Sequence, residues 1–393
     1  MTTFSVVSDR RRIAKESLLH FDYSLLIATV MVAFLGVLMV YTATREKLVL
    51  AGLSPKYYLE RQGIWVLMGI AAMLVTVMID YRHIKVLGYV FYGGVVMGLI
   101  GVLTPIGKRA LGAQRWFQLG PLQLQPSEFA SLAIILAVAI FLSRETGPLP
   151  MRRLVGVLAL AGVPMLLVVK QPDIGTAIIL GIVLLAELVM ARIRMLHLVG
   201  LLLVGALGIY VVIHLGILQS YQLKRLTSFV NPSGTYSTTG YNLAQSKIAI
   251  GAGGVFGKGL FHGTQTNLAY VPEQQTDFIF TAVGEQLGFL GAGLLLGAFG
   301  FICWRVWRVV VVARDHLGRL LAAGVLAFLA FSIFQNAAMT MGIMPITGIP
   351  LPFMSYGGSA ALSFFTAVGI VLGIGMRNSR YLPEDRRDFL GQS

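Results

Sequence analysis

Long apolar runs are the feature that most restricts the fold of this chain. A helix needs about 20 mostly apolar residues to cross a bilayer core, and ten such stretches occur among the 393 residues. Their apolar residues are continuous rather than alternating, which argues against membrane-spanning β-strands. The sequence therefore predicts an all-α, polytopic membrane protein. The ten predicted transmembrane helices cover residues 22–44, 63–79, 86–104, 127–143, 154–170, 174–191, 196–215, 278–303, 320–340 and 357–376.

The composition agrees with this class, and the chain reads as one integral membrane domain over residues 1–393. Charged residues make up 12% of the chain, against about 25% in soluble domains. The first predicted helix lacks a cleavage site, so we expect it to be a retained anchor rather than a signal peptide. Residues 216–277 form one long connection before the eighth predicted helix. We predict a large extracellular loop there, because connections of this length are usually functional.

The distribution of charge predicts the orientation of the chain. The net charge is +14, from 31 Lys and Arg against 17 Asp and Glu. Cytoplasmic termini place 19 cations inside and 12 outside, as the positive-inside rule favours. The cations lie between apolar runs rather than on a polar face, so nucleic acid is not an expected partner. The outer 12 run against the rule and indicate an anionic ligand on that side.

A glycine-rich segment, GAGGVFGKG at 251–259, superficially resembles a phosphate-binding loop. A Walker A loop needs Gly and Ser or Thr where this chain has Ala252 and Gly259, and it needs a preceding strand. We therefore do not expect a nucleotide, although Lys247 and Lys258 remain candidates for contacts with phosphate. The histidines show no metal-ligand spacing. A divalent cation bridging outer carboxylates such as Glu128 stays open.

Acidic residues near the outer ends of predicted helices are the main candidates for chemistry, because a carboxylate beside a span is costly unless paired or used. Capping of the following helix is the alternative explanation for Asp173 and Asp277, and for Glu128 the alternative is a first-turn acid at a helix N-terminus. Trp116 is either an interfacial aromatic or a wall for a sugar ring. Irregular Pro- and Gly-rich backbone at 342–360 implies an outward-facing polar cavity. The outer acids are Glu128, Asp173, Asp277 and Glu285, and the cations at the same level are Lys108, Arg115 and Lys170.

Several blocks together resemble one known family. They are GAQRWFQLG with QPSE, QPDIGTA, QSKIAIGAGGVFGKG, HGTQTNLAYVPEQQTDFIFTAVGEQLGF and GIPLPFMSYGGSA. In this order they are similar to the SEDS proteins of shape, elongation, division and sporulation, and more to the elongation (RodA-like) branch than to the division (FtsW-like) branch. The resemblance implies a peptidoglycan glycosyltransferase with ten helices. It would polymerise lipid II, the undecaprenyl-diphosphate-linked disaccharide peptide, on the outer face of the bacterial cytoplasmic membrane.

The resemblance also implies roles for particular residues. The family requires the acid of the TDFIF block, here Asp277, and we expect it to activate the acceptor 4-hydroxyl as a general base. Leu111 stands where a Lys is frequent in relatives. By motif, substrate contacts are implied for Trp116, Glu128, Glu285, Lys247 and Lys258, and the cations expected to hold diphosphate are Lys108, Arg115, Lys224, Arg225, Lys247 and Lys258.

The implied partners are lipid II, membrane lipids and a class B penicillin-binding transpeptidase. Three alternatives stay open from the sequence. A lipid II flippase would also use an outward cavity and cations, a non-catalytic scaffold would need no carboxylate, and a division-type polymerase would share the chemistry.

Overall fold

The computed structural model describes residues 21–110, 113–120, 122–145, 147–214, 225 and 238–378. Each of the ten predicted stretches coincides with a helix, and within the described residues seven helices are long and apolar enough to cross a membrane. Apolar helices at 126–142, 174–190 and 195–208 are shorter. The helices are α2 (Tyr23–Leu50), α3 (Tyr57–Met78), α4 (Lys85–Val102), α5 (Pro126–Leu142), α6 (Met151–Lys170), α7 (Ile174–Met190), α8 (Met195–His214), α10 (Thr238–Ala252), α11 (Thr264–Asn267), α12 (Ile279–Val312), α13 (His316–Met341) and α14 (Gly358–Asn378).

A small antiparallel sheet interrupts the helices between α4 and α5, where no strand was predicted. Its strands are β1 (Lys108–Ala110), β2 (Ala113–Leu119) and β3 (Leu122–Leu124), in the order β1-β2-β3. Two of the strands have three residues each, too few for an alternating pattern to stand out. Gly120 turns the chain between β2 and β3 with a φ of 60°, a conformation that glycine adopts without steric cost. β2 contacts α4 and α5, and β3 contacts α14.

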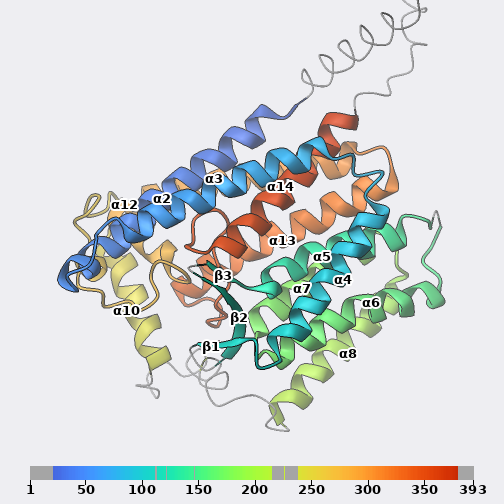
Figure 1. The fold of residues 1–393 in the computed structure, drawn as a ribbon, viewed down its shortest axis with the longest axis horizontal. Helices are drawn as coiled ribbons and strands as arrows, with labels where there is room; N and C mark the ends of the chain where they lie inside the picture. Colours follow the sequence, from blue (N-terminus) through green and yellow to red (C-terminus); the bar gives the residue numbers. More distant parts are fainter. Residues whose placement is uncertain are drawn as a thin grey trace, which may run out of the picture.

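Close helix contacts through small residues build the centre of the bundle. Gly69 of α3 faces Phe365 of α14, and an added Cβ would lie 2.3 Å from its ring. Trp65 covers Gly358 in the same way at the start of α14. In membranes such small residues allow helices to approach closely, and packing replaces the hydrophobic effect as the driving force. The helices α5, α13 and α14 are buried along most of their length and pack against one another (Figure 1).

Polar contacts tie helix ends together at one end of the bundle. At one end, Arg305 of α12 pairs with Asp22 before α2 at 2.7 Å, and Arg377 of α14 donates to the carbonyl of Met78 at 2.9 Å. The start of α2 and the end of α14 therefore lie at the same end (Figure 1). This agrees with an even number of crossings between them, and the assignment of that end to the cytoplasm stays a prediction.

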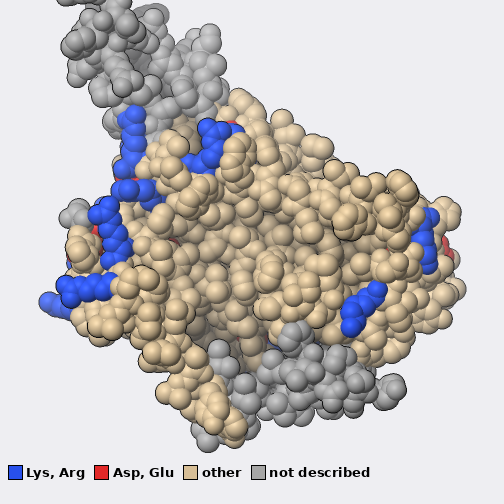
Figure 2. Space-filling model, turned by 180° about the vertical axis from the view of Figure 1, so that it is seen from behind, with Lys and Arg blue, Asp and Glu red and all other residues tan. Residues whose placement is uncertain are grey.

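The surface between the two ends is apolar. Figure 2 shows one face on which Lys and Arg lie toward the margins, while a broad central area carries neither cations nor acids. Large hydrophobic side chains are exposed at the surface of the bundle, among them Leu203 of α8 and Leu294 of α12. Such a surface is stable in lipid, where exposed apolar side chains carry no penalty.

The glycine-rich segment (residues 251–259) is inserted into an interruption of α12. Gly288 is non-helical, with φ 67° and ψ −165°. In an unbroken helix the amides of Phe289 and Leu290 would donate to the carbonyls of Glu285 and Gln286. Instead, all four groups pair with the glycine-rich segment: Lys258 N to Glu285 O at 3.0 Å, Gly259 N to Gln286 O at 3.0 Å, Phe289 N to Gly254 O at 2.9 Å and Leu290 N to Val255 O at 3.0 Å. The glycines permit backbone contact with α12 here.

Candidate functional site

Asp277 lies just before α12, held through its backbone by α13. The Asn336 side-chain amide donates to the carbonyl of Asp277 at 2.9 Å and to that of Ile349 at 2.8 Å. The Pro- and Gly-rich loop therefore lies beside Asp277, and Gly348 faces the carboxylate. A Cβ on Gly348 would come 3.2 Å from Asp277 Oδ2, and the φ of Gly348 is 77°. Asp277 does not cap α12, whose N-cap is Phe278, so the capping alternative is wrong for this residue.

Arg225 is the cation with the largest electrostatic effect on the Asp277 carboxylate. A Cβ on Gly348 would lie 3.4 Å from Arg225 Nη1, so both charged groups border the same glycine. Burial raises the pKa of Asp277 to about 6, and the Arg225 guanidinium opposes this increase. Desolvation disfavours the charged carboxylate, whereas a nearby cation favours it. A carboxyl with such a pKa is mostly ionised at neutral pH and can still accept a proton.

Arg115 reaches the site from β2. Its Nε donates to the carbonyl of Gln171 at 2.9 Å, its Nη2 donates to the carbonyl of Pro172, and its Nη1 lies 3.8 Å from Asp173 Oδ2. Asp173 also accepts from the amide of Thr176 at 3.2 Å, so it caps α7, as the alternative explanation for this residue expects. The guanidinium is therefore fixed at the start of α7 by contacts with the backbone.

Glu128 lies near this group. It lies in the first turn of α5. It interacts electrostatically with Asp173, Asp277 and Arg115. The structure thus brings together three of the four predicted outer acids, together with Arg115 and Arg225, although they come from five separate parts of the chain.

The β-hairpin formed by β1 and β2 places two further predicted residues opposite each other. Trp116 pairs in register with Lys108 across β1 and β2. Lys108 is exposed and its Nζ donates to Gln118 Oε1 at 3.2 Å. Trp116 is half-buried, next in sequence to Arg115. Lys170 is exposed in the last turn of α6.

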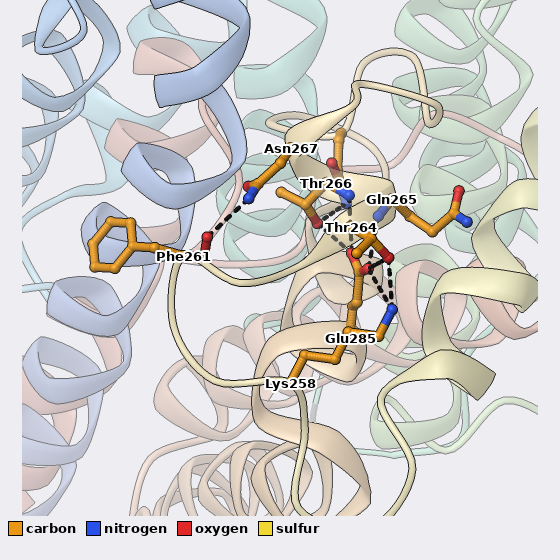
Figure 3. A network of polar contacts seen from close by, with 8 residues as sticks. Lys258, Phe261, Thr264, Gln265, Thr266, Asn267 and Glu285 are labelled. Atoms are coloured by element: carbon orange, nitrogen blue, oxygen red, sulfur yellow. Dashed lines mark hydrogen bonds and ion pairs between the residues drawn. The ribbon is translucent and has the colours of Figure 1, made fainter.

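Glu285 and Lys258 form a separate internal network, shown in Figure 3. The Glu285 side chain is fully buried. It accepts from Gln265 N at 2.8 Å, Thr266 N at 2.9 Å and Thr266 Oγ1 at 2.7 Å. Lys258 Nζ lies 3.6 Å from Glu285 Oε1 and donates to Thr264 Oγ1 at 2.6 Å. These contacts fix α11 and the glycine-rich segment to α12, and the substrate contacts predicted for both residues stay predictions.

Glu285→Gln is expected to lower the free energy of unfolding by about 2–4 kcal/mol. The amide of Gln can accept through only one oxygen, so a buried donor of α11 and the Lys258 ammonium would lose their partner. Thermal unfolding in detergent measures the effect. The matched control is Glu46→Gln, which removes a carboxylate that is 40% exposed and paired only at 4.0 Å. Lost activity at unchanged stability would contradict a structural role for Glu285.

Lys247 is exposed on α10, and its aliphatic part passes Gly342 at the end of α13. Lys224 and Leu111 lie outside the described residues. Sequence reasoning missed Asn336, although its presence with Gln335 in an apolar span is a signal, because polar residues in spans are usually functional or buried in the bundle. Among the described residues, no three His, Cys, Asp or Glu side chains are grouped to hold a metal ion.

Comparison with known proteins shows the family of this chain. Residues 23–380 match the family described as "Cell cycle protein", which comprises FtsW, RodA and SpoVE. The probable peptidoglycan glycosyltransferase FtsW of Trichlorobacter lovleyi is 36% identical over 366 residues, covering 91% of this chain and 93% of the relative. The peptidoglycan glycosyltransferase MrdB of Escherichia coli K12 is 33% identical over 355 residues, covering 90% and 93%.

A solved structure is also similar. It is described as "Structural coordination of polymerization and crosslinking by a peptidoglycan synthase complex", and its matching chain superposes with a TM-score of 0.74 at 27% identity, covering 92% of this chain and 99% of that chain. The matched residues 23–380 include the small sheet and the residues around Asp277. This chain belongs to the FtsW/RodA/SpoVE family, a family of multi-pass bacterial membrane proteins.

Proposed function

We propose that this chain is a peptidoglycan glycosyltransferase that polymerises lipid II, with Asp277 as general base. The observation that carries the proposal is the position of Asp277. Its backbone is fixed by Asn336, its carboxyl has a pKa of about 6, and Arg225 and Arg115 act on it electrostatically. The names of the relatives, FtsW and MrdB, support the glycosyltransferase class.

The reaction follows from these groups. The acceptor 4-hydroxyl gives its proton to Asp277 while its oxygen forms a bond to the anomeric carbon of the donor. The bond from that carbon to the diphosphate oxygen breaks, and undecaprenyl diphosphate leaves with the electron pair. Arg225 and Arg115 stabilise the negative charge that develops there, which is most effective in a site with little water. A single displacement inverts the anomeric carbon.

The orientation and the partner belong to the same proposal. Both termini are cytoplasmic and the Asp277 site faces outward, because the 19 inner cations outnumber the 12 outer ones. The partner is a class B penicillin-binding transpeptidase, as the similar peptidoglycan synthase complex supports by its description of polymerization with crosslinking. The role is cell elongation. Relatives named FtsW and MrdB differ by only three points in identity, 36% against 33%, so this assignment depends on the HGTQ and SYGGSA blocks.

The direct test is to incubate the purified full chain with labelled lipid II and to separate the products on a gel. A ladder of glycan strands is expected, with and without the transpeptidase. Lipid II that crosses a vesicle membrane but forms no polymer would support the flippase instead. Absence of both polymer and transport would support a scaffold.

The pH dependence of polymerisation provides a second test. The pKa of Asp277 is raised to about 6, and only the ionised carboxylate can accept a proton. The rate at low substrate concentration is therefore expected to be constant above pH 7 and to fall about tenfold per pH unit below pH 6. The measurement is the initial rate of lipid II consumption between pH 5 and pH 8. A profile that stays flat down to pH 5 would contradict Asp277 as the base.

A further inference from the structure

Four side chains that the proposed mechanism does not use form a cluster at the outer end of α3. They are Tyr57, Tyr58 and Arg61 of α3 and Tyr356 of the loop before α14, and we call them the aromatic cluster. The Arg61 guanidinium lies 4.3 Å from the centre of the Tyr57 ring. Tyr58 meets Tyr57 edge to face at 5.1 Å and Tyr356 at 4.9 Å between ring centres. Arg61 also hydrogen-bonds to the Tyr356 side chain.

The aromatic cluster is tied directly to the segment that carries Asp277. The amide of Tyr356 donates to the carbonyl of Gln275 at 2.8 Å, and Ser355 Oγ donates to the carbonyl of Thr276 at 2.6 Å. These two carbonyls lie within two residues of Asp277. Glu273 interacts electrostatically with both Tyr58 and Asp277. A ligand that contacts the aromatic cluster therefore borders the segment that carries Asp277.

Other residues already supply the packing that holds α3 against this loop. Gln62 is fully buried and donates to the carbonyl of Ser355 at 3.1 Å. Trp65 packs on Gly358 one turn further along α3. Tyr57, by contrast, is 42% exposed, and Tyr58, Arg61 and Tyr356 are half-buried. The aromatic cluster therefore exposes rings that the contact between α3 and α14 does not require.

The chemistry of the aromatic cluster matches a saccharide better than a phosphate. Tyrosine rings offer apolar faces together with polar hydroxyls, which suits a sugar ring with C–H faces and a hydroxylated edge. Arg61 and the exposed carboxylate of Glu273 can bond hydroxyl and acetamide groups. A diphosphate or an anionic lipid headgroup would be repelled by Glu273, which has the same sign of charge. The single Arg61 is also engaged with Tyr57 and Tyr356.

We infer that the aromatic cluster is a saccharide subsite that holds the glycan strand beside Asp277 during polymerisation. This inference rests on the proposed function, because the strand is its product. Tyr57 stacks on one N-acetylated sugar, and Arg61 with Tyr356 orients the next group toward the carboxylate. The subsite keeps the strand bound between additions, so it determines how many sugars are added before release.

The binding test separates this inference from the catalytic proposal. The parent is full-length Asp277→Asn protein, which cannot turn over, and the probe is a soluble peptidoglycan tetrasaccharide without lipid or diphosphate. Tyr57→Ala in this parent is expected to weaken binding about three- to tenfold, and Tyr57→Trp is expected to restore it. Tyr241→Ala is the matched control, since Tyr241 is 44% exposed on α10 and outside the aromatic cluster.

The same Tyr57 change in the otherwise unaltered chain is expected to shorten the glycan strands that the protein makes. Equal tetrasaccharide affinity for parent and Tyr57→Ala overturns the inference, and so does the absence of binding to the parent. Displacement of the tetrasaccharide by inorganic diphosphate or by phosphatidylglycerol vesicles would assign the aromatic cluster to an anion instead. If the unaltered chain makes no polymer but binding depends on Tyr57, the catalytic proposal fails and the subsite stands.

Discussion

Asp277→Asn is expected to reduce lipid II polymerisation by about 10²- to 10⁴-fold, the usual contribution of a general base. Asn has the same shape as Asp but cannot take a proton from the acceptor hydroxyl. The fold should be unaffected, because Asn336 binds the backbone carbonyl of residue 277 and not its carboxylate. Gly348 would still leave room for the side chain. The rate of strand formation on a gel measures the loss.

Two measurements make the result decisive. The unfolding temperature of Asp277→Asn should equal that of the unaltered chain, which shows that lost activity is not lost structure. Glu46→Gln, near the end of α2, removes another carboxylate and should keep full activity. Asp277→Asn protein that forms a normal ladder would refute the general base and leave electrostatics and binding as the only contributions from this region.

Gly257→Ala is expected to lower the free energy of unfolding by about 2–5 kcal/mol. Gly257 has a φ of 79°, and a Cβ there would lie 2.2 Å from the carbonyl oxygen of Gln286. That oxygen belongs to the opened part of α12 and accepts from Gly259 N. The backbone of α12 cannot retreat without losing the bonds that replace its own ladder. Thermal unfolding in detergent, or the yield of folded protein, measures the effect.

Two nearby glycines serve as graded controls for this change. Gly254 has a φ of 55° but open space around its Cβ position, so Gly254→Ala should cost only the backbone strain of about 1–2 kcal/mol. Gly251 lies in α10 with nothing within 4 Å, and Gly251→Ala should be neutral or stabilising by up to about 1 kcal/mol. Equal stability of all three variants would show that the glycine-rich segment does not support α12.

The helices were predictable because burial in lipid requires continuous apolar length, which a single sequence displays directly. Every predicted stretch coincides with a helix, although α12 continues to Val312 and not to residue 303 as predicted. The β-hairpin was missed because its pairing depends on contacts between strands of three to seven residues. The interruption at Gly288 was missed too, since it requires the glycine-rich segment to arrive from another part of the chain.

The structure brings together several charges that the sequence places at the same level, and their roles in the site stay predictions. Asp173, Glu128, Arg115 and Asp277 were expected at one level and do interact. Glu285 looked equivalent to them by position, but its carboxylate is satisfied by α11 and Lys258. Asn336 was overlooked because an amide in an apolar span has no partner that can be read from the sequence.

The sequence by itself determined that this protein lies in a membrane, where its apolar helices occur and which family it is similar to. These properties depend on composition and local order, since each helix satisfies its own backbone within the bilayer. Only the tertiary structure decided how the glycine-rich segment is used and which acids meet cations. It also decided that the aromatic cluster contacts the segment that carries Asp277. Those arrangements join residues far apart in the chain, and a contact between two polar groups is specified by packing rather than by either residue alone.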